Sequence, residues 1–401
     1  MDKIKRIYES VLKDHFSMNR QMAFLCGPRQ VGKTTAARKE VPVVYINWDD
    51  QTDRQIILKG PNGVYHHYKL ADFNKSNIQL VFDEIHKYPR WKQFLKGFFD
   101  KYQGDFKVLV TGSARLNVFK RGGDSLMGRY FLYRMHPLSV GEMVRTTFSQ
   151  DEIQQPTKVE KDLIPQLLKF GGFPEPFLKG DQRFYNRWKR MRTEQFFYED
   201  VRDSTNINAI AQLEILSEIL KERAGQLVNY STLSNEIQVT VNTVKKWIET
   251  LESLYFCFRV RPWSNNIPKG LRKQPKIYLW DWSYISDQGA KLENFIASHL
   301  LKAAHFWTDV GFGDYGVYFL RDKMKREVDF LMIRNHKPWF IVEVKSSANK
   351  RISPALEYFK NILGIDHAFQ VDFGTDFIQR DCFQEKRSIR VPAATLLSQL
   401  V

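Results

Sequence analysis

The stretch of sequence that decides the fold of the first domain reads Gly27-Pro-Arg-Gln-Val-Gly32-Lys33-Thr34, which fits the pattern G-x-x-x-x-G-K-[ST]. In this pattern the glycines let the loop curl so that backbone N–H groups face phosphates. The lysine reaches the β- and γ-phosphates of a nucleotide, and the hydroxyl ligates Mg²⁺. An apolar run precedes the loop and a helical pattern follows it, as the motif requires. The predicted contacts to ATP and Mg²⁺ are Gly27, Pro28, Arg29, Gln30, Val31, Gly32, Lys33, Thr34 and Thr35.

A second motif follows at Ile78–Glu84, where an apolar strand ends in two carboxylates. Asp83 is predicted to hold Mg²⁺, usually through water, and Glu84 to polarise the water that attacks the γ-phosphate. A strand that ends in Asp-Glu is common by itself. Its weight comes from the combination with the loop at Gly27–Thr34, and together they predict an ATP site.

Two further signals leave alternatives open. Another strand ends in polar groups at Thr111 and Ser113, and either hydroxyl could sense the γ-phosphate or simply cap the junction of strand and loop. Arg129 precedes the fifth predicted strand. It could supply positive charge to the transition state, from its own chain or across a subunit interface, or it could form a surface ion pair.

Apolar runs alternate with polar helical stretches over the first 150 residues or so, which is typical of an α/β domain with a parallel sheet. The predicted strands are Met22–Cys26, Pro42–Asn47, Gln79–Phe82, Lys107–Thr111 and Tyr130–Met135. The predicted helices are Lys33–Glu40 and Trp91–Tyr102, and Lys59–His67 is expected to be loop and short helix. The patterns divide the chain into an ATPase domain at 1–150, a helical linker at 151–227, a winged helix at 228–275 and an α/β domain at 276–401.

Composition limits the class of protein. A chain of 401 residues with 43% hydrophobic residues can build two or three cores and is not a long disordered segment. The formal net charge of +16 favours a polyanionic partner, which could be nucleic acid, nucleotide or an anionic membrane surface. Charge alone does not choose among these partners.

The sequence shows no secretory signal and no apolar run long enough to span a bilayer, so a soluble, cytoplasmic protein is expected. Cys26, Cys257 and Cys382 lie far apart among apolar or aromatic neighbours and are expected to be reduced packing residues. The histidines form no ligand spacing, so no structural metal is predicted.

The segment from residue 228 to 263 predicts a helix, a turn, a longer helix and a strand, which is the order of a winged helix. Asn242, Lys245 and Lys246 are expected on the exposed face of the second helix. The following stretch, Arg259–Lys276, holds six basic residues and no acidic one, which suits contact with DNA phosphates. The alternative is that this module only packs against the rest of the chain. A second basic cluster, Arg183–Arg192, is interpreted as a solvated helix face whose aromatic residues are core.

The C-terminal part contains a predicted hairpin centred on His336. In this register Asp329 faces Glu343, and Lys345 returns to the side of Glu343 because side chains alternate along a strand. Carboxylates at this spacing suit Mg²⁺, and Lys345 could orient or deprotonate the water that attacks a phosphodiester. Glu293, on a predicted helix, could reach the other side of the metal. A surface ion pair, or a fold used only for binding, is the alternative.

These motifs together resemble the AAA+ superfamily, and more narrowly the prokaryotic ATPases whose C-terminal half is a domain of unknown function with a nuclease-like core. The resemblance implies a sheet in the order 5-1-4-3-2 with ATP at the carboxyl edge of its strands. Glu293, Asp329, Glu343 and Lys345 resemble the PD-(D/E)XK nuclease core, although Val328 stands where that motif has proline. The resemblance is carried by Gly27–Thr35, Val81–His86, Thr111–Ala114, Ser125–Arg129, His136–Ser139 with Glu142, and Gly171–Pro176.

Two functional hypotheses follow. The first is an AAA+ protein that binds and hydrolyses ATP with Mg²⁺, acts on DNA and carries a Mg²⁺-dependent nuclease at its C-terminus. The second is a regulatory nucleotide switch whose C-terminal domains only bind DNA or a protein partner. A homo-oligomer is compatible with both, and a membrane role with neither; a motor that acts on protein is a third alternative.

Overall fold

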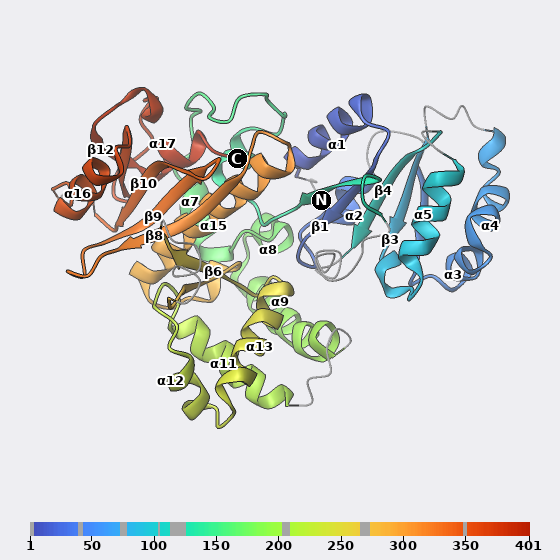
Figure 1. Ribbon diagram of the computed structural model, residues 1–401, viewed down its shortest axis with the longest axis horizontal. Helices are drawn as coiled ribbons and strands as arrows, with labels where there is room; N and C mark the ends of the chain where they lie inside the picture. Colours follow the sequence, from blue (N-terminus) through green and yellow to red (C-terminus); the bar gives the residue numbers. More distant parts are fainter. Residues whose placement is uncertain are drawn as a thin grey trace. The chain divides into compact units, whose positions relative to one another are not determined.

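The computed structural model describes residues 4–38, 43–72, 78–102, 105–112, 126–202, 209–264, 273–347 and 351–401. The chain divides into two compact units (Figure 1). The N-terminal unit comprises Met1–His136 with Thr146–Phe148, and the C-terminal unit comprises Pro137–Arg145 with Ser149–Val401. The division into four domains at the predicted boundaries stays a prediction.

A parallel five-stranded sheet organises the N-terminal unit, with its strands in the order β2-β3-β4-β1-β5. This order is the expected 5-1-4-3-2 read from the other edge. The central strands are buried along their whole length, as expected for a sheet covered on both faces. The strands are β1 (Met22–Cys26), β2 (Val43–Asn47), β3 (Gln79–Asp83), β4 (Lys107–Gly112) and β5 (Tyr130–Arg134).

Helices complete this unit: α1 (Ile7–Met18), α2 (Lys33–Ala37), α3 (Gln51–Leu58), α4 (Gly60–His67) and α5 (Trp91–Lys101), with short turns η1 (Leu70–Asp72) and η3 (Ile85–Lys87). The apolar side of α5 packs into an aromatic core with β1 and β3, where Phe94 and Phe98 lie edge-on to Phe82. The sequence predicted loop and a short helix at residues 59–67. The structure has the helix α4 over nearly all of this stretch, so the predicted helix is present and longer than expected. The preceding helix α3 was not predicted, and Asp50 caps it by accepting from Thr52 N at 2.8 Å.

A mixed seven-stranded sheet organises the C-terminal unit, in the order β12-β11-β10-β9-β8-β6-β7. The hairpin β6–β7 is antiparallel, and β6 also pairs with β8, so the strands that follow the predicted winged-helix helices form one edge of this sheet. The strands are β6 (Cys257–Pro262), β7 (Lys276–Leu279), β8 (Tyr315–Arg321), β9 (Glu327–Arg334), β10 (Lys337–Lys345), β11 (His367–Asp372) and β12 (Ser388–Pro392).

Helical segments precede and cover this sheet (Figure 1). They are α6 (Val140–Val144), α7 (Leu163–Phe170), α8 (Pro174–Lys179), α9 (Gln182–Gln195), η5 (Phe196–Val201), α11 (Ile210–Glu222), α12 (Tyr230–Glu236), α13 (Val241–Ser253), η6 (Trp282–Tyr284), α15 (Gln288–Asp309), α16 (Pro354–Leu363), η7 (Cys382–Gln384) and α17 (Ala393–Ser398). The buried stripe of α13 consists of Val244, Trp247, Ile248 and Leu251. The helices α12 and α13 and the strand β6 occur in the predicted order.

All three cysteines are free and buried, as expected for packing residues. In the described part of the chain, no helix combines the length and the apolar character that crossing a membrane requires.

Candidate functional sites

The phosphate-binding loop lies between β1 and α2, where two glycines allow its shape. Gly27 has φ +155°, and a Cβ there would collide with Met135 O, because Met135 N is hydrogen-bonded to the end of β1 at 2.7 Å. Gly32 has φ +101° and is the N-cap of α2. A side chain at either position would push the loop away from its curled form.

Lys33 lies within the curl of this loop. Its Nζ donates to the backbone oxygens of Gly27 at 2.9 Å and Pro28 at 2.7 Å, and the residue is 7% exposed. The ammonium is therefore already placed on the loop whose backbone is predicted to surround the phosphates. Of the other predicted contacts, Val31 is buried and Thr35 is exposed.

Asp83 contacts side chains from both neighbouring strands and from the phosphate-binding motif. It ends β3, and its carboxylate accepts from Thr34 Oγ1 at 3.3 Å and from Thr111 Oγ1 at 2.5 Å. Thr34 and Asp83 are 49 positions apart in sequence, so the fold assembles this pair. A hydroxyl and a carboxylate are hard oxygen ligands, and the pair fits Mg²⁺ as the sequence predicted.

Tyr45 is a component of this site that the sequence did not predict. Its hydroxyl donates to Asp83 Oδ2 from the neighbouring strand β2. Burial raises the pKa of Tyr45 to about 12, and the hydrogen bond to Asp83 adds to this effect. The signal available beforehand was the strand order, which places β2 beside β3. Thr111, a candidate γ-phosphate sensor, uses its hydroxyl on Asp83, and Ser113 lies outside the described residues.

Glu84 follows Asp83 in a left-handed conformation with φ +53°. Burial raises its pKa, while Lys87, at 3.5 Å, lowers it. His86 also lies close, with Nε2 at 3.6 Å from Glu84 Oε2. The carboxylate is thus placed beside Asp83, in a setting that favours acceptance of a proton.

Arg129 lies at the opposite end of the strands from the phosphate-binding loop. It directly precedes β5, and Tyr130 pairs with Met22 at the start of β1, whereas the phosphate-binding loop follows the end of β1. The guanidinium forms an ion pair with Asp100, with Nε 2.7 Å from Oδ1. The structure therefore does not bring Arg129 to the ATP site of its own chain.

The C-terminal constellation involves the hairpin β9–β10. The predicted register is found away from the turn, where Met332 pairs with Phe340 and Phe330 with Val342, so residue numbers sum to 672. Next to the turn Arg334 pairs with Lys337, and a register shift after Pro338 separates the two parts of the hairpin. Lys345 Nζ lies 2.6 Å from Glu343 Oε1 on the same side of β10. Asp329 is bound by Val344 N at 2.7 Å. Burial raises the pKa of Asp329 well above its usual range, and the carboxylates of Glu293 and Glu343 raise it further.

Two partners of these carboxylates, and a further carboxylate, Glu327, were not predicted. Lys276 Nζ on β7 lies 3.1 Å from Glu293 Oε1 and 2.7 Å from Glu327 Oε1. Tyr278 donates to the same oxygen of Glu293 at 2.7 Å. Burial opposes a charged Lys276, but Glu293, Asp329 and Glu327 outweigh it and raise its pKa, so the ammonium stays protonated. The signal available beforehand was the alternation of Lys276 and Tyr278 on one face of β7.

The Mg²⁺ ligands predicted in the C-terminal unit, Glu293, Asp329 and Glu343, do not fit a metal as they stand. Among the described residues, no group of three or more His, Cys, Asp or Glu side chains is arranged to hold an ion. Glu293 is engaged by an ammonium and a phenol, and Glu343 by Lys345. The structure thus brings Glu293, Asp329, Glu343 and Lys345 into one region, but with Lys276 as a cation among them.

Some residues of the predicted DNA-binding surface are exposed, and others are not. Asn242, Lys245 and Lys246 are exposed on α13. The prediction that the basic stretch 259–276 contacts DNA does not hold for its two end residues. Arg259 is paired with Glu252 at 2.5 Å, and Lys276 is buried in the carboxylate cluster. Residues 265–272 lie outside the described part of the chain.

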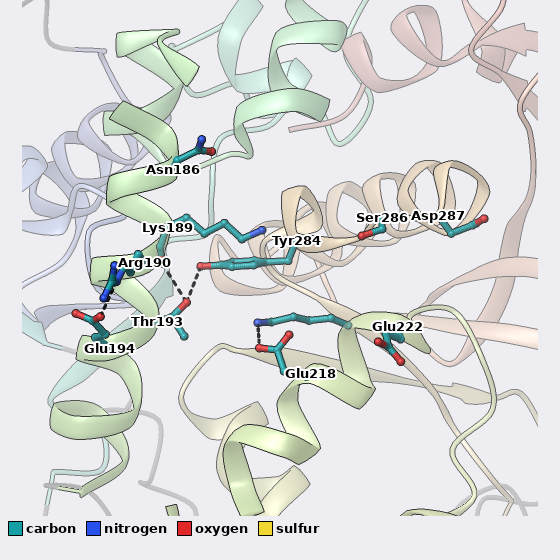
Figure 2. A pocket seen from close by; sticks show the side chains of 11 residues that line it. Asn186, Lys189, Arg190, Thr193, Glu194, Glu218, Glu222, Tyr284, Ser286 and Asp287 are labelled. Carbon is teal, nitrogen blue, oxygen red and sulfur yellow. Dashed lines mark hydrogen bonds and ion pairs between the residues drawn. The ribbon is translucent and has the colours of Figure 1, made fainter. Parts of the chain in front are cut away.

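The cluster Arg183–Arg192 belongs to α9, whose Tyr185 and Trp188 are buried, in agreement with the sequence interpretation. A cavity of about 790 Å³ opens between α9, α11 and η6 (Figure 2). Lys189 and Lys221 approach the ring of Tyr284 to 4.4 and 4.7 Å. The carboxylates in its walls are at least as numerous as the cationic side chains, so the cavity does not favour a polyanion. The lining residues are Asn186, Lys189, Arg190, Thr193, Glu194, Glu218, Lys221, Glu222, Tyr284, Ser286 and Asp287.

Three family models match the chain. Residues 19–144 match the model of an AAA domain, and residues 161–287 and 288–391 match two models described as domains of unknown function. The parallel five-stranded sheet and the AAA match together support a nucleotide-binding, AAA-type ATPase domain.

The relatives of the chain include an uncharacterized protein of Methanocaldococcus jannaschii, 24% identical over 308 residues that cover 73% of this chain and 66% of that protein. An uncharacterized protein of Mycobacterium tuberculosis is 21% identical over 359 residues, covering 84% and 72% of the two chains. The match thus spans slightly less than two thirds of the archaeal relative.

Similar solved structures include the ORC1 protein of Aeropyrum pernix in complex with DNA, with a TM-score of 0.31 and 16% identity, covering 72% of this chain and 90% of that chain. The DNA clamp loader delta protein of Bacillus subtilis has a TM-score of 0.29 and 10% identity, covering 62% and 87%. Similarity at this level carries no conclusion about function.

Proposed function

We propose that the chain is an AAA+ protein that binds and hydrolyses ATP and acts on DNA. The observation that supports ATP binding most directly is the contact of Thr34 Oγ1 with Asp83 Oδ2 at 3.3 Å, beside the buried ammonium of Lys33. A P-loop site requires this juxtaposition of hydroxyl, carboxylate and ammonium.

Each residue of the site has a role in this proposal. Lys33 exchanges its contacts with loop carbonyl oxygens for the β- and γ-phosphates, while Thr34 and Asp83 hold Mg²⁺. When bound, Mg²⁺ neutralises charge that develops on the phosphates. Glu84 accepts the proton of the attacking water. Arg129 has no role at the ATP site of its own chain in this proposal, because it pairs with Asp100 at the opposite end of the strands from the phosphate-binding loop.

Action on DNA is supported by the net charge of +16 and by the exposed Asn242, Lys245 and Lys246 of α13. Neutralised phosphates release counterions, so such binding weakens steeply with salt. Cleavage of DNA by Glu343 and Lys345 has less support, because Lys276 is paired within the carboxylate cluster. That observation favours the second candidate function, a nucleotide-controlled switch whose C-terminal unit binds DNA or a protein partner.

The ATP proposal is tested with Lys33→Ala in the full chain, using a fluorescent ATP analogue and phosphate release. The expected result is loss of ATP affinity by about two orders of magnitude, because an ammonium that contacts phosphate contributes roughly 3 kcal/mol. Lys13→Ala is the control, since Lys13 is exposed on α1 and carries the same charge. Equal affinity in the two variants would refute the nucleotide site.

The DNA proposal is tested with the double variant Lys245→Ala/Lys246→Ala, by measuring affinity for duplex DNA against salt concentration. The expected result is weaker binding and a slope reduced by about 2, because each lysine that no longer neutralises a phosphate lowers the slope by roughly one unit. Lys13→Ala/Lys96→Ala removes the same charge from exposed positions on α1 and α5. Identical slopes in both double variants would show that α13 does not contact DNA.

A further inference from the structure

The carboxylate cluster of the C-terminal unit consists of Glu293, Glu327, Asp329 and Glu343, from α15, β9 and β10. Glu327 and Asp329 are two positions apart on β9, so they share one face of the strand. Asp329 and Glu343 interact electrostatically, as do Asp329 and Glu293. Four acidic groups this close together are ionised only with positive charge close by, because burying unbalanced charge is unfavourable.

Lys276 supplies the central positive charge of the carboxylate cluster. It is 5% exposed, and its Nζ joins two segments of the cluster through Glu293 at 3.1 Å and Glu327 at 2.7 Å. Its backbone is fixed on both sides, because Lys276 pairs with Val260 of β6 and with Leu227. An ammonium held this way cannot simply swing into solvent.

The remaining cations lie at the margins of the cluster. Arg321 contacts the second oxygen of Glu327 at 3.2 Å, and Lys345 contacts Glu343 Oε1 at 2.6 Å. The other oxygen of Glu343 is buried and has no hydrogen-bond partner among the described residues. This oxygen keeps lone pairs that a divalent ion would use once the ammonium of Lys276 is removed.

We propose that Lys276 is the built-in cation of this cluster and keeps a divalent metal ion out of it. Mg²⁺ and Mn²⁺ need several carboxylate oxygens with free lone pairs. Lys276 and Tyr278 both bind the single oxygen Glu293 Oε1, and the ammonium repels a second cation at the same carboxylates. The cluster therefore has the carboxylates of a metal site, but an ammonium already occupies them and repels a metal ion.

This inference goes beyond the proposed ATPase and does not depend on it. It predicts that removal of one ammonium converts the cluster into a divalent-metal site, because the four carboxylates then lack their central counter-ion. Lys276→Met keeps a similar chain length without the charge. Lys273→Met is the matched control, since Lys273 lies three positions earlier and is exposed.

The experiment measures Mn²⁺ binding to metal-stripped, nucleotide-free full chain by electron paramagnetic resonance, together with thermal unfolding. Lys276→Met is expected to bind one Mn²⁺ more than wild type, with affinity at least about tenfold above any wild-type binding at this cluster. Mn²⁺ is also expected to raise the unfolding temperature of this variant selectively. Binding by the phosphate loop is common to all proteins compared, so the difference isolates the cluster.

A second change locates the new site. Adding Glu293→Gln to Lys276→Met is expected to abolish the extra Mn²⁺. Wild type that already binds a Glu293-dependent Mn²⁺ would overturn the proposal, and so would a folded Lys276→Met that gains none. If Lys276→Met unfolds without metal, Mn²⁺ is expected to restore its fold, and failure of that rescue would equally overturn it.

Discussion

Replacing Lys302 by Met is expected to destabilise the C-terminal unit by about 3–5 kcal/mol, because it leaves a buried carboxylate without its counter-ion. Lys302 is 2% exposed and Glu142 is fully buried, and Lys302 Nζ lies 2.5 Å from Glu142 Oε2. The same ammonium donates to Pro137 O at 3.0 Å. This ion pair holds the segment 137–145 against α15. Its removal is therefore expected to weaken that contact as well as to leave a buried charge in the core.

The assay is urea unfolding of the full chain, followed by tryptophan fluorescence. Lys158→Met is the matched control, because Lys158 forms an ion pair with Glu160 at 3.3 Å but both side chains are more than two-thirds exposed. Such pairs contribute little, so no measurable change is expected there. The double variant Lys302→Met/Glu142→Leu is expected to recover most of the stability, since it removes the carboxylate too. A single Lys302→Met as harmless as Lys158→Met would refute the reasoning.

Three further predictions concern single side chains. Burial lowers the pKa of His299 to about 3, and Lys302 lowers it further, while the hydrogen bond of Nδ1 to Phe295 O opposes the shift. The neutral ring accepts from Val140 N through Nε2. Above the unfolded pKa of about 6.5 this stabilisation is complete, and it is lost as pH falls, by roughly 2 kcal/mol at pH 5; His299→Gln should flatten that dependence in urea titrations at pH 7 and 5. Tyr45→Phe removes one hydroxyl donor from Asp83 and should lower the stability of the N-terminal unit by about 1.5–3 kcal/mol, which an unchanged urea midpoint would contradict. Arg129→Ala should leave the affinity of the chain for a fluorescent ATP analogue unchanged, and weaker binding would contradict its placement at the opposite end of the strands from the phosphate-binding loop.

The N-terminal sheet was predictable because each strand is a short apolar run next to a polar break. All five strands and their order agree with the sequence interpretation, within a residue or two at the ends. The helix α1 was missed, although Ile7, Tyr8, Val11, Leu12 and His15 form a buried stripe at helical spacing. Its neighbours in sequence carry no recognisable motif, so the periodic signal was the only guide.

The nucleotide site was predictable for a related reason. Its loop is one contiguous segment, and Asp83 follows a strand whose place beside β4 is fixed by the parallel order. Contacts that cross between strands were not visible beforehand. Tyr45 and Thr111 reach Asp83 from both sides only because β2 and β4 flank β3.

The carboxylate cluster shows why correct residues do not determine a site's chemistry. A register centred on His336 matches the pairs from Met332 with Phe340 to Phe330 with Val342, but the shift after Pro338 that produces this register was not visible in the sequence. The counter-ion comes from β7, which precedes the hairpin by some fifty positions and joins the sheet from its far edge. No spacing rule links Lys276 to Glu293, yet that one contact decides whether the carboxylates face an ammonium or a metal. An acidic pattern in the sequence therefore does not determine the chemistry of the cluster, because the charge balance depends on a cation that another strand supplies.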